Sequence, residues 1–140
     1  MYRKLLLTIA AVAVMTSTAV PALSDEIVLI SSHTRDFIGA DAANSGTLKG
    51  VPLETQALVV DRITLDGNKV AFRALDGKFV RAGVGAQSML AAASAHIRGW
   101  ETFEIVRVTN AKFAIKSVQS GKYLSLNANG RLTASAADIG

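Results

Sequence analysis

Six polar residues in three loops are the part of this sequence best suited to bind a ligand. They are Asp41, Asn44, Gln87, Asn127, Asn129 and Arg131. Side chains of these types donate and accept the hydrogen bonds by which proteins hold sugar hydroxyl groups. The alternative is that Asn and Asp stand here because tight turns require them. The loops 41–45, 81–88 and 125–131 contain no aromatic residue to supply the apolar face against which a sugar ring packs.

Patterns typical of catalysis or metal binding are absent from the sequence. The chain has no cysteine, and its 2 histidines, His33 and His96, stand at unmatched places. Neither histidine has partners at metal-ligand spacing, and no Gly-x-Ser-x-Gly motif marks a serine nucleophile. A glycosidase needs a pair of carboxylates, but nothing singles out two of the 11 acidic residues. We therefore expect no enzyme activity, no cofactor and no metal.

The first 24 residues have the layout of a secretory signal peptide. Arg3 and Lys4 precede an apolar run over Leu5–Met15, and small residues at Ala22 and Ser24 suit signal peptidase. A membrane-spanning helix needs roughly 20 apolar residues, about twice the length of this run. We therefore expect cleavage after Ser24 or Ala22, a secreted or periplasmic mature chain, and no stable membrane insertion after cleavage.

Charge argues against nucleic acid as a partner. The whole chain has a net charge of +4, but Arg3 and Lys4 lie in the segment expected to be removed. Without these two, 13 basic residues face 11 acidic ones, and no dense basic cluster remains. Because no disulfide can form, burial of apolar side chains must supply the stability.

The elements that would position the loops recur with a period near 43 residues. VAFRALDGKFV at 70–80 matches FAIKSVQSGKYL at 113–124, and a fainter copy begins at Val28. Each copy is typical of an apolar strand, a polar turn and a second strand opened by an aromatic residue. Leu48, Leu90 and Leu132 stand 42 residues apart at matching places, which predicts that all three are buried. The alanine-rich stretch 89–96 is interpreted as strand and loop, because its repeat counterpart follows a hairpin turn.

The repeats indicate one all-β domain over 25–140, in units of about 25–66, 67–109 and 110–140. Three four-stranded units predict a β-trefoil, which is a six-stranded barrel capped by three hairpins. The strongest sequence match lies in the second unit, at 76–80, 90–92 and 97–104, which read DGKFV, LAA and IRGWETFE. These motifs resemble the fascin-like, or actin-crosslinking-like, domains of secreted bacterial type. Trp100 and Phe103 are interpreted as core side chains.

The third unit reaches Ile139 and Gly140, where its fourth strand should begin. The trefoil is therefore expected to lack that strand, which leaves an open five-stranded barrel and an unpaired apolar edge at Ile27–Ser31. Truncation of the chain is one explanation for the missing strand. The resemblance implies a secreted, non-catalytic module that binds carbohydrate or polysaccharide, by analogy of fold. The alternative is a module that docks on a cell-surface protein.

Overall fold

The structure, a computed structural model, describes residues 3–8, 11–15 and 25–139. Its strands β1–β13 span Arg3–Thr8, Ala11–Met15, Glu26–Ser31, Phe37–Asp41, Thr47–Val51, Val60–Thr64, Lys69–Ala74, Phe79–Val84, Met89–Ser94, Phe103–Arg107, Phe113–Ser117, Tyr123–Leu126 and Leu132–Ala136. Three single-turn 3-10 helices lie between strands: η1 at Ala42–Asn44, η2 at Glu54–Gln56 and η3 at Gly99–Glu101. Within the described residues there is no α-helix, and hence none long and apolar enough to cross a membrane.

Individual strands lie where the repeat predicts them. The apolar runs that open the three copies are β3, β7 and β11, and the alanine-rich stretch begins with β9 rather than a helix. Gly77 and Gly121, in the turns after β7 and β11, have φ angles of 86° and 70°, which glycine adopts without strain. In the first copy Arg35 takes this place, with a φ of 68°. The turn therefore keeps its left-handed residue despite the loss of the glycine.

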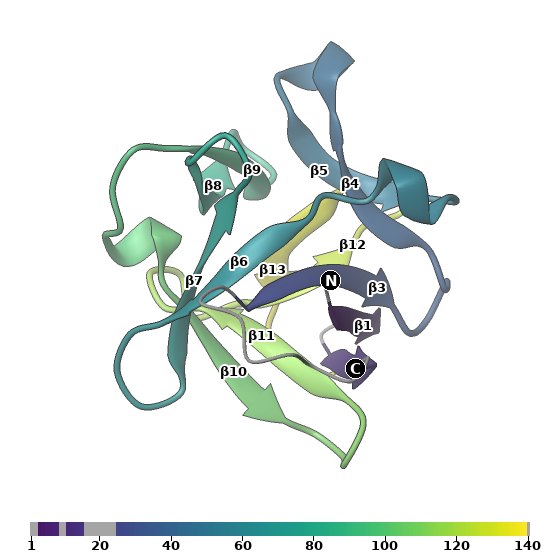
Figure 1. Ribbon diagram of the computed structural model, residues 1–140, viewed down its shortest axis with the longest axis vertical. Helices are drawn as coiled ribbons and strands as arrows, with labels where there is room; N and C mark the ends of the chain where they lie inside the picture. The colour runs from purple at the N-terminus through teal and green to yellow at the C-terminus, as the bar shows by residue number, and fades with distance from the viewer. Residues whose placement is uncertain (1–2, 9–10, 16–24, 140) are drawn as a thin grey trace.

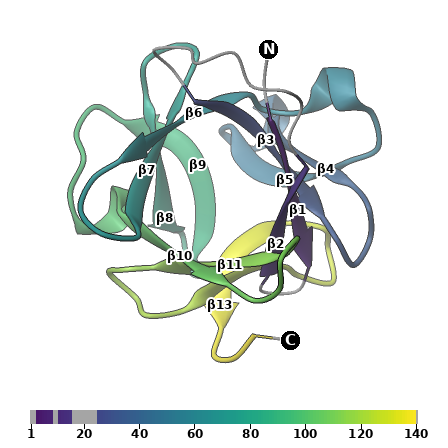
Figure 2. The ribbon, with the colours of Figure 1, turned by 60° about the horizontal axis from the view of Figure 1, so that its bottom comes forward.

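Ten strands close into one ring of antiparallel pairs. The ring runs β3–β4–β5–β9–β13–β12–β11–β10–β7–β6 and returns to β3. Strand β8 lies off this ring and pairs with β7 and β9. The hairpin of β1 and β2 joins the same sheet between β3 and β11, as Figures 1 and 2 show.

The prediction of a fascin-like β-trefoil is wrong. In that fold a six-stranded barrel carries three separate capping hairpins, whereas here β4, β5, β9, β12 and β13, all expected in caps, belong to the closed ring. Strand β5 pairs with β9 through Thr47 and Ala91, and β9 pairs with β13 through Met89 and Thr133. These pairs join the hairpins into the wall, and a local repeat pattern contains no information about them.

The predicted open edge at Ile27–Ser31 is also wrong. Strand β3 pairs with β1 in parallel over this whole range, and β2 pairs with β11 between Val12 and Phe113. Both β1 and β2 belong to the segment expected to be a signal peptide. The expected cleavage points lie outside the described residues, so cleavage stays a prediction.

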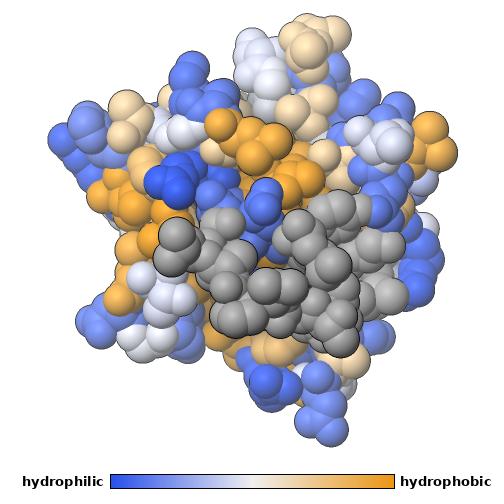
Figure 3. Space-filling model, in the orientation of Figure 1, coloured by the Kyte–Doolittle hydropathy of each residue, from blue (hydrophilic) through white to orange (hydrophobic). Residues whose placement is uncertain are grey.

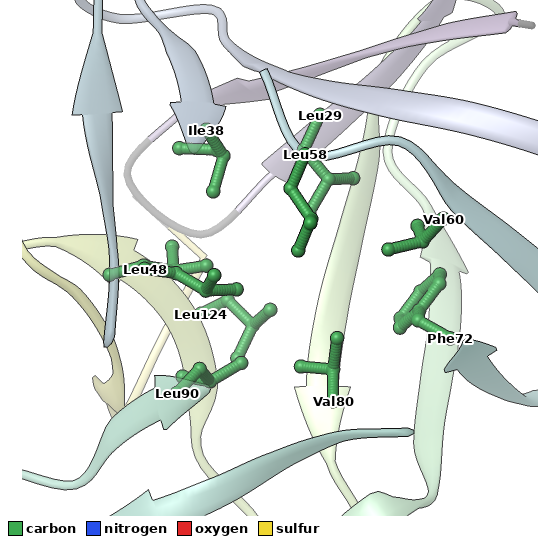
Figure 4. Close-up of a pocket in the computed structure, with 10 residues that line it drawn as sticks. Leu29, Ile38, Leu48, Leu58, Val60, Phe72, Val80, Leu90 and Leu124 are labelled. Carbon is green, nitrogen blue, oxygen red and sulfur yellow. The ribbon is translucent and has the colours of Figure 1, made fainter. Parts of the chain in front are cut away.

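Apolar side chains from most of the ring meet in one core. Leu48, Leu90 and Leu132 are at most 2% exposed, which confirms their predicted burial. Figure 4 shows side chains from distant parts of the chain, Leu29, Val80 and Leu124 among them, around the same interior space. That space is only about 10 Å³ and its lining is apolar, so it cannot hold a ligand. In Figure 3 the outer surface alternates between polar and apolar patches, which is ordinary for a protein surface.

Replacement of a core leucine should cost far more stability than replacement of an exposed one. Leu90→Ala should lower the free energy of unfolding by about 2–5 kcal/mol, because it leaves a cavity that the packed ring cannot fill. Leu75 is 80% exposed and provides the matched control, since Leu75→Ala should change stability by less than about 0.5 kcal/mol. Denaturant titration measures both values. Equal losses in the two variants would contradict the described core.

Candidate functional site

Three of the six predicted site residues meet at one place. Asp41, at the end of β4, is 8% exposed. Its Oδ2 atom accepts a 2.6 Å hydrogen bond from Nδ2 of Asn44 and lies 2.7 Å from the Arg131 guanidinium. The Lys49 ammonium lies 3.8 Å from the same oxygen. Arg131 reaches this place because it pairs with Lys49 across an isolated bridge.

This environment favours the charged form of Asp41. The hydrogen bonds from Asn44 and Arg131, followed by the nearby positive charges, lower the pKa of Asp41 from 3.8 to about 2. The second carboxylate oxygen, Oδ1, accepts the backbone N–H of Ala43 at 3.2 Å and so caps η1. Both oxygens are therefore engaged within the protein, and the cluster holds two loops together.

The other three predicted residues make no ion pair with this cluster. Asn127 Oδ1 accepts the backbone N–H groups of Asn129 and Arg131 at 2.9 and 3.0 Å, which shapes the turn between β12 and β13. Asn129 and Gln87 are exposed, and within the described residues the Gln87 side chain makes no hydrogen bond. The geometry favours the turn alternative for Asn127. Ligand binding by any of the six stays a prediction.

A second place, which the sequence patterns did not indicate, is an open pocket beside η3 with a volume of about 250 Å³. Its lining combines an aromatic ring with charged and hydroxyl groups: Arg81, Ser94, Ala95, His96, Arg98, Trp100 and Glu101. Trp100 is 36% exposed, so its interpretation as a core side chain is wrong. Phe103, at 0% exposed, is in the core as predicted.

Gly83 in β8 explains why the Trp100 ring lies at the surface. A Cβ atom on Gly83 would lie 2.6 Å from the indole Cζ3 atom, so the ring rests directly on the glycine backbone. Gly83 also has a φ of 74°, which other residues rarely adopt. The wall of the ring is thus a platform under the indole, and no space exists there for the ring to enter the core.

Glu101 fixes the turn that carries the tryptophan. Its carboxylate is buried, and Oε2 accepts the Ser94 hydroxyl at 2.7 Å while Oε1 accepts the Arg98 backbone N–H at 2.9 Å. The Thr102 hydroxyl donates to the Arg98 carbonyl oxygen at 2.8 Å. The backbone on either side of Trp100 is therefore held by side-chain hydrogen bonds.

Two arginines give the pocket positive charge. Arg81 is half-buried in β8, Arg98 is exposed, and in the described part of the chain neither guanidinium forms an ion pair. An aromatic ring beside free guanidinium groups can pack against a sugar ring and bind its acidic substituents. Two sequence features could have indicated this site. The charged neighbours of Trp100 are unusual for a core position, and a glycine inside a strand often marks a close approach.

No protein-family model matches the chain, and no curated protein matches it either. The resemblance to fascin-like domains therefore has no support from a family match. Among the residues with described positions, no group of three or more His, Cys, Asp or Glu side chains could hold a metal ion.

The pKa of Asp41 predicts a specific acid sensitivity. A carboxyl group whose pKa is lower in the folded state stabilises the fold above its unfolded pKa and loses that effect as pH falls through its folded pKa. The stability advantage of the wild type over Asp41→Asn should therefore be constant at neutral pH and shrink between pH 3.8 and about 2. Melting temperatures measured across this range test it, with Asp138→Asn, an exposed position, as the control. An advantage that does not change with pH would contradict the described ion pair.

Proposed function

We propose that this protein is a non-catalytic module that binds carbohydrate in the pocket around Trp100, and that its preferred ligands are acidic polysaccharides. The observation that carries the proposal is the partly exposed indole beside two arginines without ion-pair partners in the described chain. This pocket replaces the three loops as the favoured place of binding.

The aromatic ring supports a sugar as the ligand. The C–H faces of a sugar ring are apolar, and they pack well on an indole that is already held in position. Gly83 and the hydrogen bonds of Glu101 provide that fixed position, so binding need not order the ring. Ser94 and His96 in the same lining offer polar groups for the sugar hydroxyls.

The charges support an acidic sugar. Glu101 is the one acidic residue of the lining, and it is 5% exposed with both oxygens accepting hydrogen bonds inside the protein. Arg81 and Arg98 therefore face the ligand without a competing carboxylate. A guanidinium binds a carboxylate or sulfate group through parallel hydrogen bonds, which a neutral sugar cannot match.

The same arrangement supports a binding role rather than hydrolysis. Glycoside hydrolysis uses two carboxyl groups on either side of the scissile bond. This lining has only Glu101, and that carboxylate is committed to η3. The signal-peptide layout of the first 24 residues fits this proposal, because export would bring the module to polysaccharides outside the cell.

Binding to a panel of polysaccharides tests the proposal. Polygalacturonate and alginate represent acidic chains, and dextran represents a neutral one. Trp100→Ala should weaken binding of the acidic chains at least about tenfold, because it removes the packing surface. Its stability cost should be about 1–3 kcal/mol, below the 3–5 kcal/mol typical of a fully buried tryptophan. Isothermal titration calorimetry and thermal melting give the two values.

Arg98→Ala should weaken binding of acidic chains about fivefold at low salt, with a smaller effect at high salt because ions screen exposed charges. Arg107→Ala, an exposed arginine on β10, is the matched control and should leave affinity unchanged. Two results would refute the proposal: no polysaccharide of the panel binds, or Trp100→Ala retains full affinity. Binding of a cell-surface protein with no polysaccharide binding would support the alternative function instead.

A further inference from the structure

The edge of β3 that faces β11 is supplied with a neighbour by the N-terminal segment alone. Strand β1 pairs with all residues from Ile27 to Ser31, so it covers one edge of β3. Strand β6, paired at Glu26 and Ile27, and strand β4, paired at Ile30, must then share the other edge. A strand has two edges only. Without residues 3–15, the first edge of β3 has no partner among the remaining described strands.

The corresponding strands β7 and β11 have permanent neighbours on that edge. Strand β6 pairs with β7 over Val60–Thr64, and β10 pairs with β11 over Phe103–Arg107. Both neighbours are antiparallel and lie in the middle of the chain. Strand β1 is instead parallel, and parallel pairing is slightly less stable per residue. The neighbour of β3 is therefore the one that differs in direction and in origin.

The two walls beside the hairpin are held independently of it. The Asp25 carboxylate lies 2.5 Å from the Arg62 guanidinium, and the Arg62 backbone N–H donates to the Asp25 carbonyl oxygen at 2.9 Å. These contacts fix the start of β3 against β6. On the other side β11 is paired with β10 over its full length and meets β2 only at Phe113. Loss of the hairpin would thus leave two positioned walls with a space for a strand between them.

The outer face of β3 is also suited to a permanent apolar cover. Ile30 pairs with Phe37, whereas the matching cross-strand pairs in β7 and β11 are Arg73 with Phe79 and Lys116 with Tyr123. Arg73 is exposed, but Val28 and Ile30 of β3 are buried, although neither belongs to the main core. A charged side chain is tolerated at this face of the other strands. Strand β3 has none over Ile27–Ser31, which is unusual for a strand edge that is meant to stay open.

We propose that β3 and β11 form a strand slot, defined by the edge of Ile27–Ser31 and by Phe113, which binds an extended apolar peptide through its backbone. Residues 3–15 are the ligand of the slot in the uncut chain, and the same segment binds when it is supplied as a separate peptide. This mode is β-strand addition, in which main-chain hydrogen bonds supply the affinity. The inference stands apart from the Trp100 pocket, since Trp100 takes no part in the slot.

The test uses the full chain with a specific protease site placed between Met15 and Asp25. The chain is folded first, then cut, and examined by size-exclusion chromatography with mass spectrometry. The N-terminal fragment should stay with the barrel after cutting. A fluorescent peptide of residues 3–15 should displace it and bind in equal molar amount, as followed by fluorescence polarisation.

A single substitution in the peptide provides the matched control. Leu5 lies opposite Leu29 in the parallel pair, and proline at this position removes a backbone N–H from the ladder. The Leu5→Pro peptide should bind at least about tenfold more weakly. Hydrogen exchange gives an independent readout, because the amides of Val28–Ser31 should lose protection when the peptide is removed and regain it on readdition, while those of Val70–Arg73 stay protected.

Three results would overturn the strand slot. The first is equal binding of the proline and unchanged peptides. The second is full protection of the β3 amides after the peptide has been washed away. The third is a cut chain that unfolds on release of the fragment and does not recover protection when the peptide is returned.

Discussion

A buried strand must satisfy its backbone hydrogen bonds on both edges, and β3 is the strand on which this requirement weighs most. Five of its six residues are buried, so water cannot replace a missing neighbour. Strands β6 and β4 share one edge, and β1 provides the other. Because β3 also belongs to the closed ring, loss of its pairing would affect the wall on both sides. The closed sheet and the core inside it depend on this strand being fully paired.

Closure of the ring also determines where functional groups can stand. The interior is filled by packed apolar side chains and leaves only about 10 Å³, so a ligand must bind outside the wall. At β8 the wall offers a bare glycine backbone, and the indole of Trp100 lies on it. The buried carboxylate of Glu101 then anchors the turn from behind. A rigid wall and a short anchored turn together produce an exposed aromatic surface with a fixed orientation, which suits recognition of a flat apolar ligand face.

The Asp41 cluster shows that charged residues close together need not form a binding site. Its ion pair with Arg131 joins two loops that are distant in sequence, and Asn44 and Ala43 take up the remaining acceptor capacity of the carboxylate. The pocket at Trp100 differs because its arginines have no carboxylate partner within the described chain. Whether a polar group is used internally or is available to a ligand thus distinguishes the two places.

Local sequence patterns determined the strands, the turns and much of the core. Alternation in 70–74 and 113–117 predicted β7 and β11, the matching leucines predicted burial, and the repeat predicted a strand where alanine propensity suggested a helix. Such features depend on neighbours along the chain, so a short segment contains the information. Tertiary structure alone decided the ring closure, the exposure of Trp100 and the pairing of β1 with β3. Backbone hydrogen bonds are chemically the same for nearly every residue, so the sequence of a strand indicates which of its faces is apolar but not which strand lies beside it. Trp100 is outside the core because Gly83 of another strand offers it a surface, and no pattern around Trp100 specifies that partner.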